Sequence, residues 1–142
     1  MPADTSGSRR LPTVPEVHKF VGFVVVSVFA VGWIWGLGAA IRKRAPSEKF
    51  WVWLAVAQVL AGLQALIGLV LLALGKRPDV WLHYVYGFGP IVVLVIAHSL
   101  ARDLDRTEPG ERPLATWVPF AAAAFICFGL TLRALMTGLG RA

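Results

Sequence analysis

The sequence predicts an all-α integral membrane protein, built as a four-helix up-down bundle, and three observations lead to this prediction. Of the 142 residues, 57% are hydrophobic and only 15% are charged, whereas soluble domains usually carry about 25% charged residues. The apolar residues gather in four runs, each long enough to cross about 30 Å of hydrocarbon as a helix. The connections between the runs are short, which leaves no room for a domain outside the membrane.

The first two runs contain almost no polar side chains. The first covers about residues 20–40, carries no charge and stops at the basic cluster 42–44. The second covers about residues 50–74, and its only large polar side chains are Gln58 and Gln64. Because a helix satisfies its own backbone hydrogen bonds, it is the only open-chain structure that spans lipid, and we expect both runs to be transmembrane helices.

The third and fourth runs each contain a side chain able to ionise. The third covers about residues 81–101 and includes His83 and His98, and the fourth covers about residues 116–136 and includes Arg133. Their length and hydropathy predict two further spans. The histidines and the arginine lie near the ends of these runs, where a polar side chain can reach the interface.

The chain outside the spans predicts a tail and leaves the orientation open. Residues 1–14 are polar and contain proline, and we expect them to be disordered, so that residues 15–142 form the transmembrane bundle. The basic residues divide evenly between the two sides of the membrane, so the positive-inside rule does not choose an orientation. The location predicted is the cell membrane, with several passes.

A two-helix hairpin is predicted to occur twice. The first run opens with His18 and Gly22, and the third opens with His83 and Gly87, both in the pattern H-x-x-x-G-F and 65 residues apart. Two looser matches, 66 and 67 residues apart, link the second and fourth runs: Trp51-Val52 with Trp117-Val118, and Gly62-Leu63 with Gly129-Leu130. They indicate two tandem hairpins, with chance as the alternative because these residue types are common in membrane spans.

Because of the repeat, His18 and His83 are candidate ligands of one haem. Parallel repeats place both histidines at one depth on helices that are diagonal in a four-helix bundle, from where they could ligate the two faces of one haem iron. Gly22 and Gly87, one turn deeper, would leave room for the flat macrocycle. The alternative is that both histidines lie at the interface and bind water or headgroups.

Other polar side chains receive more ordinary interpretations. Arg133, like Lys19 or Arg77, could neutralise the propionates of a haem, or could extend along the helix to the interface. His98 lies about 22 Å along the helix from His83, too far to bind the same iron, and is predicted to be interfacial. Met136 is a weaker candidate as a second ligand. Gln64 is predicted to bind a neighbouring helix, and Cys127 to serve packing.

Several classes of function are disfavoured. All eight carboxylates fall in tails or connections, whereas proton-coupled transporters usually keep an acid within the membrane. The chain has no phosphate-binding loop, zinc-protease motif, CxxC pair or nucleophile elbow. Hydrolytic and thiol redox chemistry are therefore not expected, and we do not expect an enzyme.

The hairpin between the second and third runs resembles those of membrane b-type cytochromes, and more narrowly one half of a heme A synthase. The resemblance rests on a run that includes Gln64 and Gly68, a short loop with Pro78, and His83-Tyr84 at the start of the next helix. It implies haem ligands on alternate helices of a four-helix bundle. The sequence departs from the pattern because His18 lies at the very edge of the membrane. The segment 82–87 is also similar to small uncharacterised bacterial membrane proteins, a similarity that implies no function.

The sequence thus predicts a small haem-binding electron-transfer protein or a cytochrome-like subunit of a respiratory membrane complex. The expected cofactor is haem b, and the expected partners are the lipid bilayer and other membrane subunits, without nucleic acid. The alternatives are a cofactor-free structural or assembly subunit of a membrane complex and, third, a small transporter or channel. The candidate site residues are His18 and His83 as iron ligands, with Arg133, Gly22 and Gly87 around them.

Overall fold

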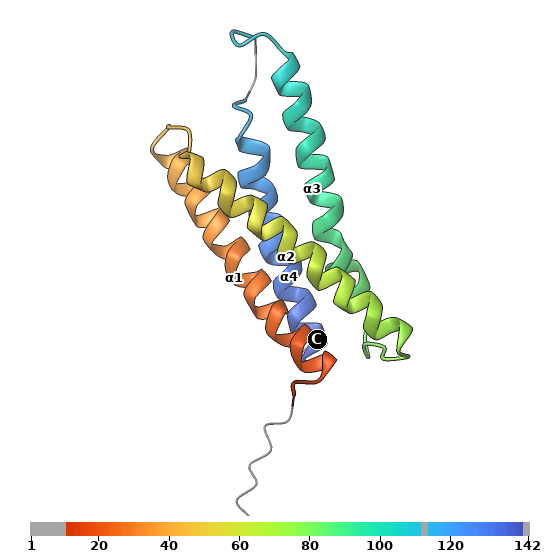
Figure 1. Cartoon of the computed structure of the whole chain (residues 1–142). Coiled ribbons are helices and arrows are strands. Elements are labelled where there is room, and N and C mark those ends of the chain that lie inside the picture. Colours follow the sequence, from red (N-terminus) through yellow and green to blue (C-terminus); the bar gives the residue numbers. More distant parts are fainter. Residues whose placement is uncertain (1–10, 112–113, 141–142) are drawn as a thin grey trace, which may run out of the picture.

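The computed structural model describes residues 11–111 and 114–140, and the regular structure of these residues is entirely helical. Four helices follow one another along the chain (Figure 1): α1 (Val14–Ile41), α2 (Glu48–Ala73), α3 (Leu82–Arg106) and α4 (Val118–Gly138). Each is long and apolar enough to cross a membrane. The predicted all-α class and the four long apolar helices are confirmed. Most of the predicted polar tail, residues 1–14, lies outside the described residues, and α1 begins at its last residue.

The helix ends follow from local sequence signals. At the start of α1 the Glu16 carboxylate accepts a hydrogen bond of 2.7 Å from the backbone N–H of Thr13, one half of a capping box, and Pro15 occupies the first turn, where its missing N–H costs nothing. After α2 the chain turns at Gly75, whose φ of +75° is readily adopted only by glycine. Pro78 follows and prevents the helix from continuing.

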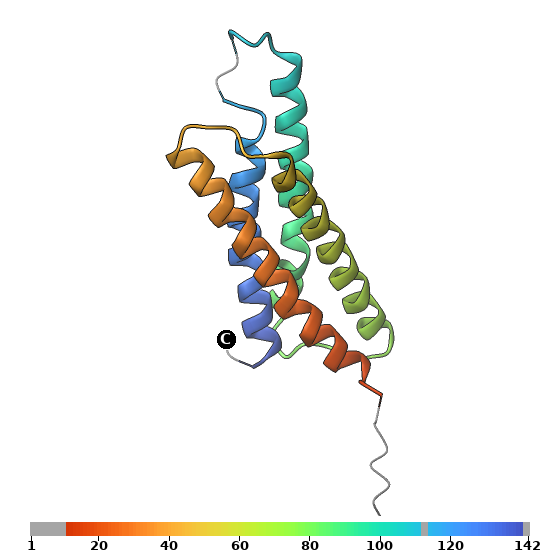
Figure 2. The same ribbon diagram turned by 60° about the vertical axis from the view of Figure 1, so that its left-hand side comes forward.

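The four helices are packed unequally. α1 packs against both α2 and α4, and α3 packs against α4, but α2 and α3 make only a small contact. Two views of the ribbon show α1 and α4 crossing closely while α2 and α3 lie apart over much of their length (Figures 1 and 2). The bundle is therefore closed on the α1–α4 side and open on the α2–α3 side.

Small residues close the seam between α1 and α4. A Cβ atom added to Gly36 would lie 2.6 Å from the Cβ atom of Ala121, and one added to Gly32 would lie 3.6 Å from that of Ala124. This close approach of backbones allows van der Waals packing to hold α1 on α4, the kind of contact by which helices associate in lipid. Around the seam lie the fully buried side chains of Phe29 and Phe50.

Buried positions of α2 recur in α4. A shift of 65 residues carries the end of α1 onto the end of α3, and a shift of 70 carries the start of α2 onto the start of α4. The second shift relates four buried residues of α2 to four buried residues of α4. These pairs are Phe50 with Phe120, Leu54 with Ala124, Ala57 with Cys127, and Ala61 with Thr131.

The structure changes the register of the repeat in its second half. The sequence matches 66 and 67 residues apart do not mark equivalent places, since Trp51 lies within α2 whereas Trp117 precedes α4. The other matched pair, Gly62 and Gly129, has no packing role that could fix a register, since nothing lies within 4 Å of a Cβ atom added to either. The physical reason is the connection between α3 and α4, residues 107–117, which is five residues longer than the connection 42–47.

Replacing Gly36 by alanine should destabilise the bundle by about 1–3 kcal/mol, because the new methyl group would overlap Ala121 and push α1 away from α4. Gly38→Ala is the matched control, since nothing lies within 4 Å of a Cβ atom added there. Unfolding by denaturing detergent, followed by circular dichroism, measures both variants. Equal stability of the two variants would show that the α1–α4 seam is not as close as described.

Candidate functional site

Two histidines from diagonal helices meet at one end of the bundle. His18 lies in the first turns of α1 and His83 in the first turn of α3, and both are half-buried. Their ring centroids are 6.2 Å apart and their planes are inclined by 57°. The structure thus brings together the two residues that the sequence analysis singled out as ligands of one iron.

Each histidine ring rests on a glycine of the other helix in its own hairpin. A Cβ atom added to Gly68 of α2 would lie 3.4 Å from Cε1 of His18, and one added to Gly138 of α4 would lie 3.1 Å from Cε1 of His83. Gly68 and Gly138 are 70 residues apart, so the internal repeat relates them as it relates the histidines. Neither glycine was expected beside a histidine, because the sequence matches between the second and fourth runs are about one turn out of register with the structure.

Thr137 contacts the ring of His83. Its hydroxyl oxygen lies 3.2 Å from Nδ1 of His83 and 3.0 Å from the backbone oxygens of both Arg133 and Ala134. When the hydroxyl hydrogen is donated to one of these carbonyls, the oxygen accepts from His83 Nδ1–H. That tautomer leaves the lone pair on Nε2 of His83, the arrangement that metal-binding histidines use.

Gln64 fixes the position of His18. Its Nε2 donates a hydrogen bond of 3.0 Å to the backbone oxygen of His18 and lies 3.4 Å from Nε2 of the same histidine. The interhelical contact expected of Gln64 is therefore made. Three buried polar atoms have no partner among the described residues, and two of them lie at this site: Nδ1 of His18 and Oε1 of Gln64, the third being Nε1 of Trp33. A buried polar atom without a partner is a place where another group can bind.

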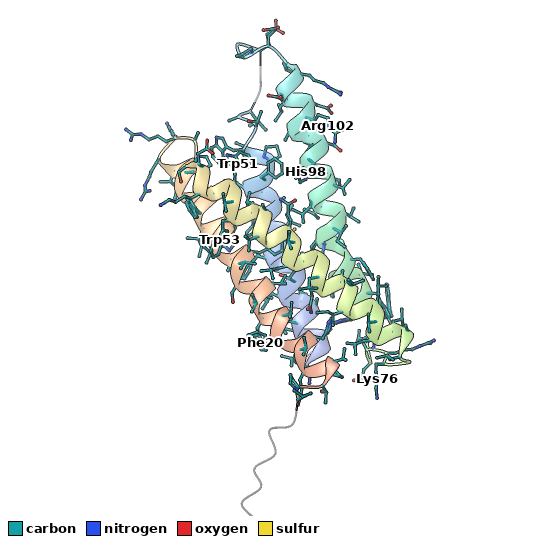
Figure 3. All side chains as sticks on the ribbon, viewed as in Figure 1. Phe20, Trp51, Trp53, Lys76, His98 and Arg102 are labelled. Carbon is teal, nitrogen blue, oxygen red and sulfur yellow. The ribbon has the colours of Figure 1, made fainter. Side chains whose placement is uncertain are left out.

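The histidines line a cavity of about 340 Å³ that is formed by all four helices. Its walls are largely apolar and include Gly22, Gly87 and Tyr84. Exposed cationic side chains, Lys19 of α1 together with Lys76 and Arg77 of the α2–α3 connection, line its edge. Figure 3 shows Lys76 at this end of the bundle and His98 toward the other end. A flat apolar molecule with anionic substituents would suit such a cavity.

The two glycines of the H-x-x-x-G-F pattern have different surroundings. A Cβ atom added to Gly22 would lie 3.2 Å from Nε2 of Gln64, so this glycine makes room for the Gln64 side chain. Nothing lies within 4 Å of a Cβ atom added to Gly87, which leaves open space in the cavity wall. The space expected beside both glycines for a macrocycle is therefore present beside Gly87 and is filled by Gln64 beside Gly22.

Arg133 lies away from the cavity. Its guanidinium carbon is 5.8 Å from the ring centroid of Tyr86 on α3, a cation–π distance, and the side chain is exposed. Neither Arg133 nor Met136 lines the cavity. The helical period explains this, because Ala134, Thr137 and Gly138 occupy the face of α4 that points toward the histidines. Lys19 and Arg77, also suggested as propionate partners, do line it.

His98 lies far from the histidine pair, as its spacing predicted. Its Nδ1–H donates a hydrogen bond of 2.8 Å to the backbone oxygen of Leu94, and its ring packs edge-on against Phe120 at 4.9 Å. Cys127 is fully buried, and its sulfur lies 3.7 Å from the backbone oxygen of Pro90. Both observations agree with roles outside the candidate site.

The described residues contain no group of three or more His, Cys, Asp or Glu side chains that could hold a metal ion. Comparisons of the chain with protein-family models, with curated proteins and with solved structures find no match.

Thr137→Val should disturb the tautomer of His83 without changing the shape of the site. Valine keeps the volume of threonine and removes the acceptor of Nδ1–H, so the proton should redistribute between the two ring nitrogens. Nitrogen-15 chemical shifts of labelled histidine report this directly. In the parent protein we expect the Nδ1–H form at His83, and in Ser27→Ala, which alters an exposed hydroxyl, the same spectrum. An Nε2–H form in the parent protein would contradict this hydrogen-bond assignment.

Proposed function

We propose that this chain is a four-span, up-down transmembrane bundle that binds one b-type haem between His18 and His83. Its role would be electron transfer, alone or as a cytochrome-like subunit of a respiratory complex in the cell membrane. The observation that carries the proposal is the geometry of the two histidines at the matched ends of α1 and α3.

The distance between the rings suits two ligands of one metal. A metal–imidazole bond is about 2.0–2.1 Å long, and the ring centre lies about 1 Å beyond the nitrogen, so two imidazoles on opposite sides of a metal have centroids about 6 Å apart. The observed separation is 6.2 Å. Among the described residues the site brings together two histidine ligands, which suits a tetrapyrrole because the macrocycle would supply the other ligands of the iron.

The surroundings of the histidines support the same assignment. The hydroxyl oxygen of Thr137 lies 3.2 Å from Nδ1 of His83, and an outer hydrogen bond at this nitrogen would orient the ring as a ligand through Nε2. His18 has no such bond, because its buried Nδ1 has no partner among the described residues. Lys19, Lys76 and Arg77 at the cavity edge offer charge-assisted partners to carboxylate groups of the macrocycle.

The two histidines decide the class of chemistry. A bound haem would supply a one-electron redox centre with a potential that depends on its ligands and burial. His18 and His83 would both be occupied in holding it, and the site would then serve electron transfer. We therefore assign electron transfer and not catalysis to this site.

An absorption spectrum of the purified protein tests the proposal. The parent protein, expressed with haem in excess, should show a sharp α-band after reduction by dithionite. His18→Ala and His83→Ala should lose this band, because each removes an axial ligand, whereas His98→Ala should keep it. A folded but colourless parent protein would overturn the haem assignment in favour of a cofactor-free assembly subunit. A band that only His83→Ala abolishes would refute His18 as the second ligand.

The double variant Lys76→Ala/Arg77→Ala should bind haem about three- to tenfold more weakly, because two cations at the cavity edge are lost while the ligands remain. Arg133→Ala is the matched control, since this arginine lies outside the cavity and its loss should leave haem affinity unchanged. Titration of haem into the apoprotein, followed by absorption, gives both affinities. A larger loss in Arg133→Ala than in the double variant would place the anionic edge of the macrocycle elsewhere.

A further inference from the structure

The crevice between α2 and α3 contains a second cavity, of about 260 Å³, whose lining includes Gln58, Ala61, Leu94 and His98. It lies on the open side of the bundle, where the two helices make their smallest contact. Ala61 also lines the histidine cavity, so the two cavities adjoin. We propose that this crevice is a binding site for a lipid-soluble quinone, preferentially in its reduced, quinol form.

The internal repeat shows that the opening is specific to this side. The repeat relates the contact of α1 with α4 to that of α3 with α2, yet only the first is closed. Gly32 and Gly36 on α1 meet Ala124 and Ala121 on α4. Their counterparts are larger: Ala97 and Ala101 on α3, and Leu54 and Trp51 on α2. The larger side chains on α2 do not fill the space toward α3: Leu54 lies against α1, with its Cδ2 atom 3.3 Å from a Cβ atom added to Gly32, and the Trp51 ring packs on Phe120 of α4.

Two polar groups in the crevice have unused hydrogen-bonding capacity. The amide of Gln58 is half-buried and has no hydrogen-bond partner among the described residues. His98 uses Nδ1–H on the backbone oxygen of Leu94, so the neutral ring keeps an acceptor at Nε2. The edge-on contact with Phe120 holds the ring in place. An unpaired amide facing lipid is costly, which favours a ligand that pairs with it.

These groups select the chemistry of the ligand. The lining of the crevice contains no charged side chain, which gives no partner to a phospholipid headgroup, and an acyl chain alone would leave Gln58 and His98 unpaired. A quinol offers a hydroxyl donor to Nε2 of His98 and a second oxygen to the Gln58 amide, with its apolar tail in the crevice. The oxidised quinone has no donor for His98, which is why we assign the reduced form as the tighter ligand.

The inference goes beyond the proposed haem site, and binding of the quinol does not require the haem. The test uses the full chain in phosphatidylcholine nanodiscs and a short-chain ubiquinone, oxidised or reduced, as the probe. Trp51 reports binding through its fluorescence, because its ring packs on Phe120 at 5.2 Å and Phe120 packs on His98. Figure 3 shows Trp51 and His98 at the end of the bundle opposite Lys76 and the histidine pair.

We expect saturable quenching of tryptophan fluorescence and, at equal concentration, tighter binding of the reduced probe. Gln58→Leu and His98→Leu should each weaken binding at least tenfold, while Ser99→Ala, which alters an exposed neighbour, should not. Thermal unfolding checks that the variants are folded. Non-saturable quenching, equal in all variants, would show that only bulk lipid occupies the crevice and would overturn the inference. Saturable binding to a colourless protein would refute the haem and leave this site standing, and a haem protein without saturable binding would do the reverse.

Discussion

The close approach of α1 to α4 is the contact on which the rest of the structure depends. Gly36 lets the two backbones pack at a distance that even alanine would prevent, because an added Cβ atom would lie 2.6 Å from that of Ala121. Because α1 also packs on α2, and α4 on α3, this one seam joins the two hairpins. The seam thereby sets the position of His18 relative to His83 along the bundle axis. It also leaves the α2–α3 side open while the α1–α4 side is closed.

Much of this arrangement follows from the sequence. Length and hydropathy were enough to predict four helices, because a membrane span has few alternatives. The H-x-x-x-G-F repeat was enough to select His18 and His83, since two residues at the same position of two equivalent helices must lie at similar depth. The sequence also placed His98 correctly away from them, because helical rise alone separates His83 from His98.

The supporting residues could not be predicted in the same way. Gly68, Gly138 and Thr137 lie beside the histidines only because of the register of α2 and α4, and the longer connection before α4 shifts that register by about one turn. The role of Gly22 also depends on a side chain from another helix, Gln64. Arg133 was expected at the cavity but faces Tyr86, since the choice between neighbouring faces of a helix end depends on packing that the sequence does not specify.

The repeat of buried residues has a consequence for how such a bundle can evolve. Two separate copies of one hairpin, related by a two-fold axis, would have two identical seams, so any change that opened one would open the other. Joining the copies in a single chain removes that symmetry requirement. Glycine and alanine can then close one seam while alanine, leucine and tryptophan occupy the equivalent positions of the other. Fusion therefore allows the two seams to differ. One can hold the helices together while the other is free to become a ligand-binding site.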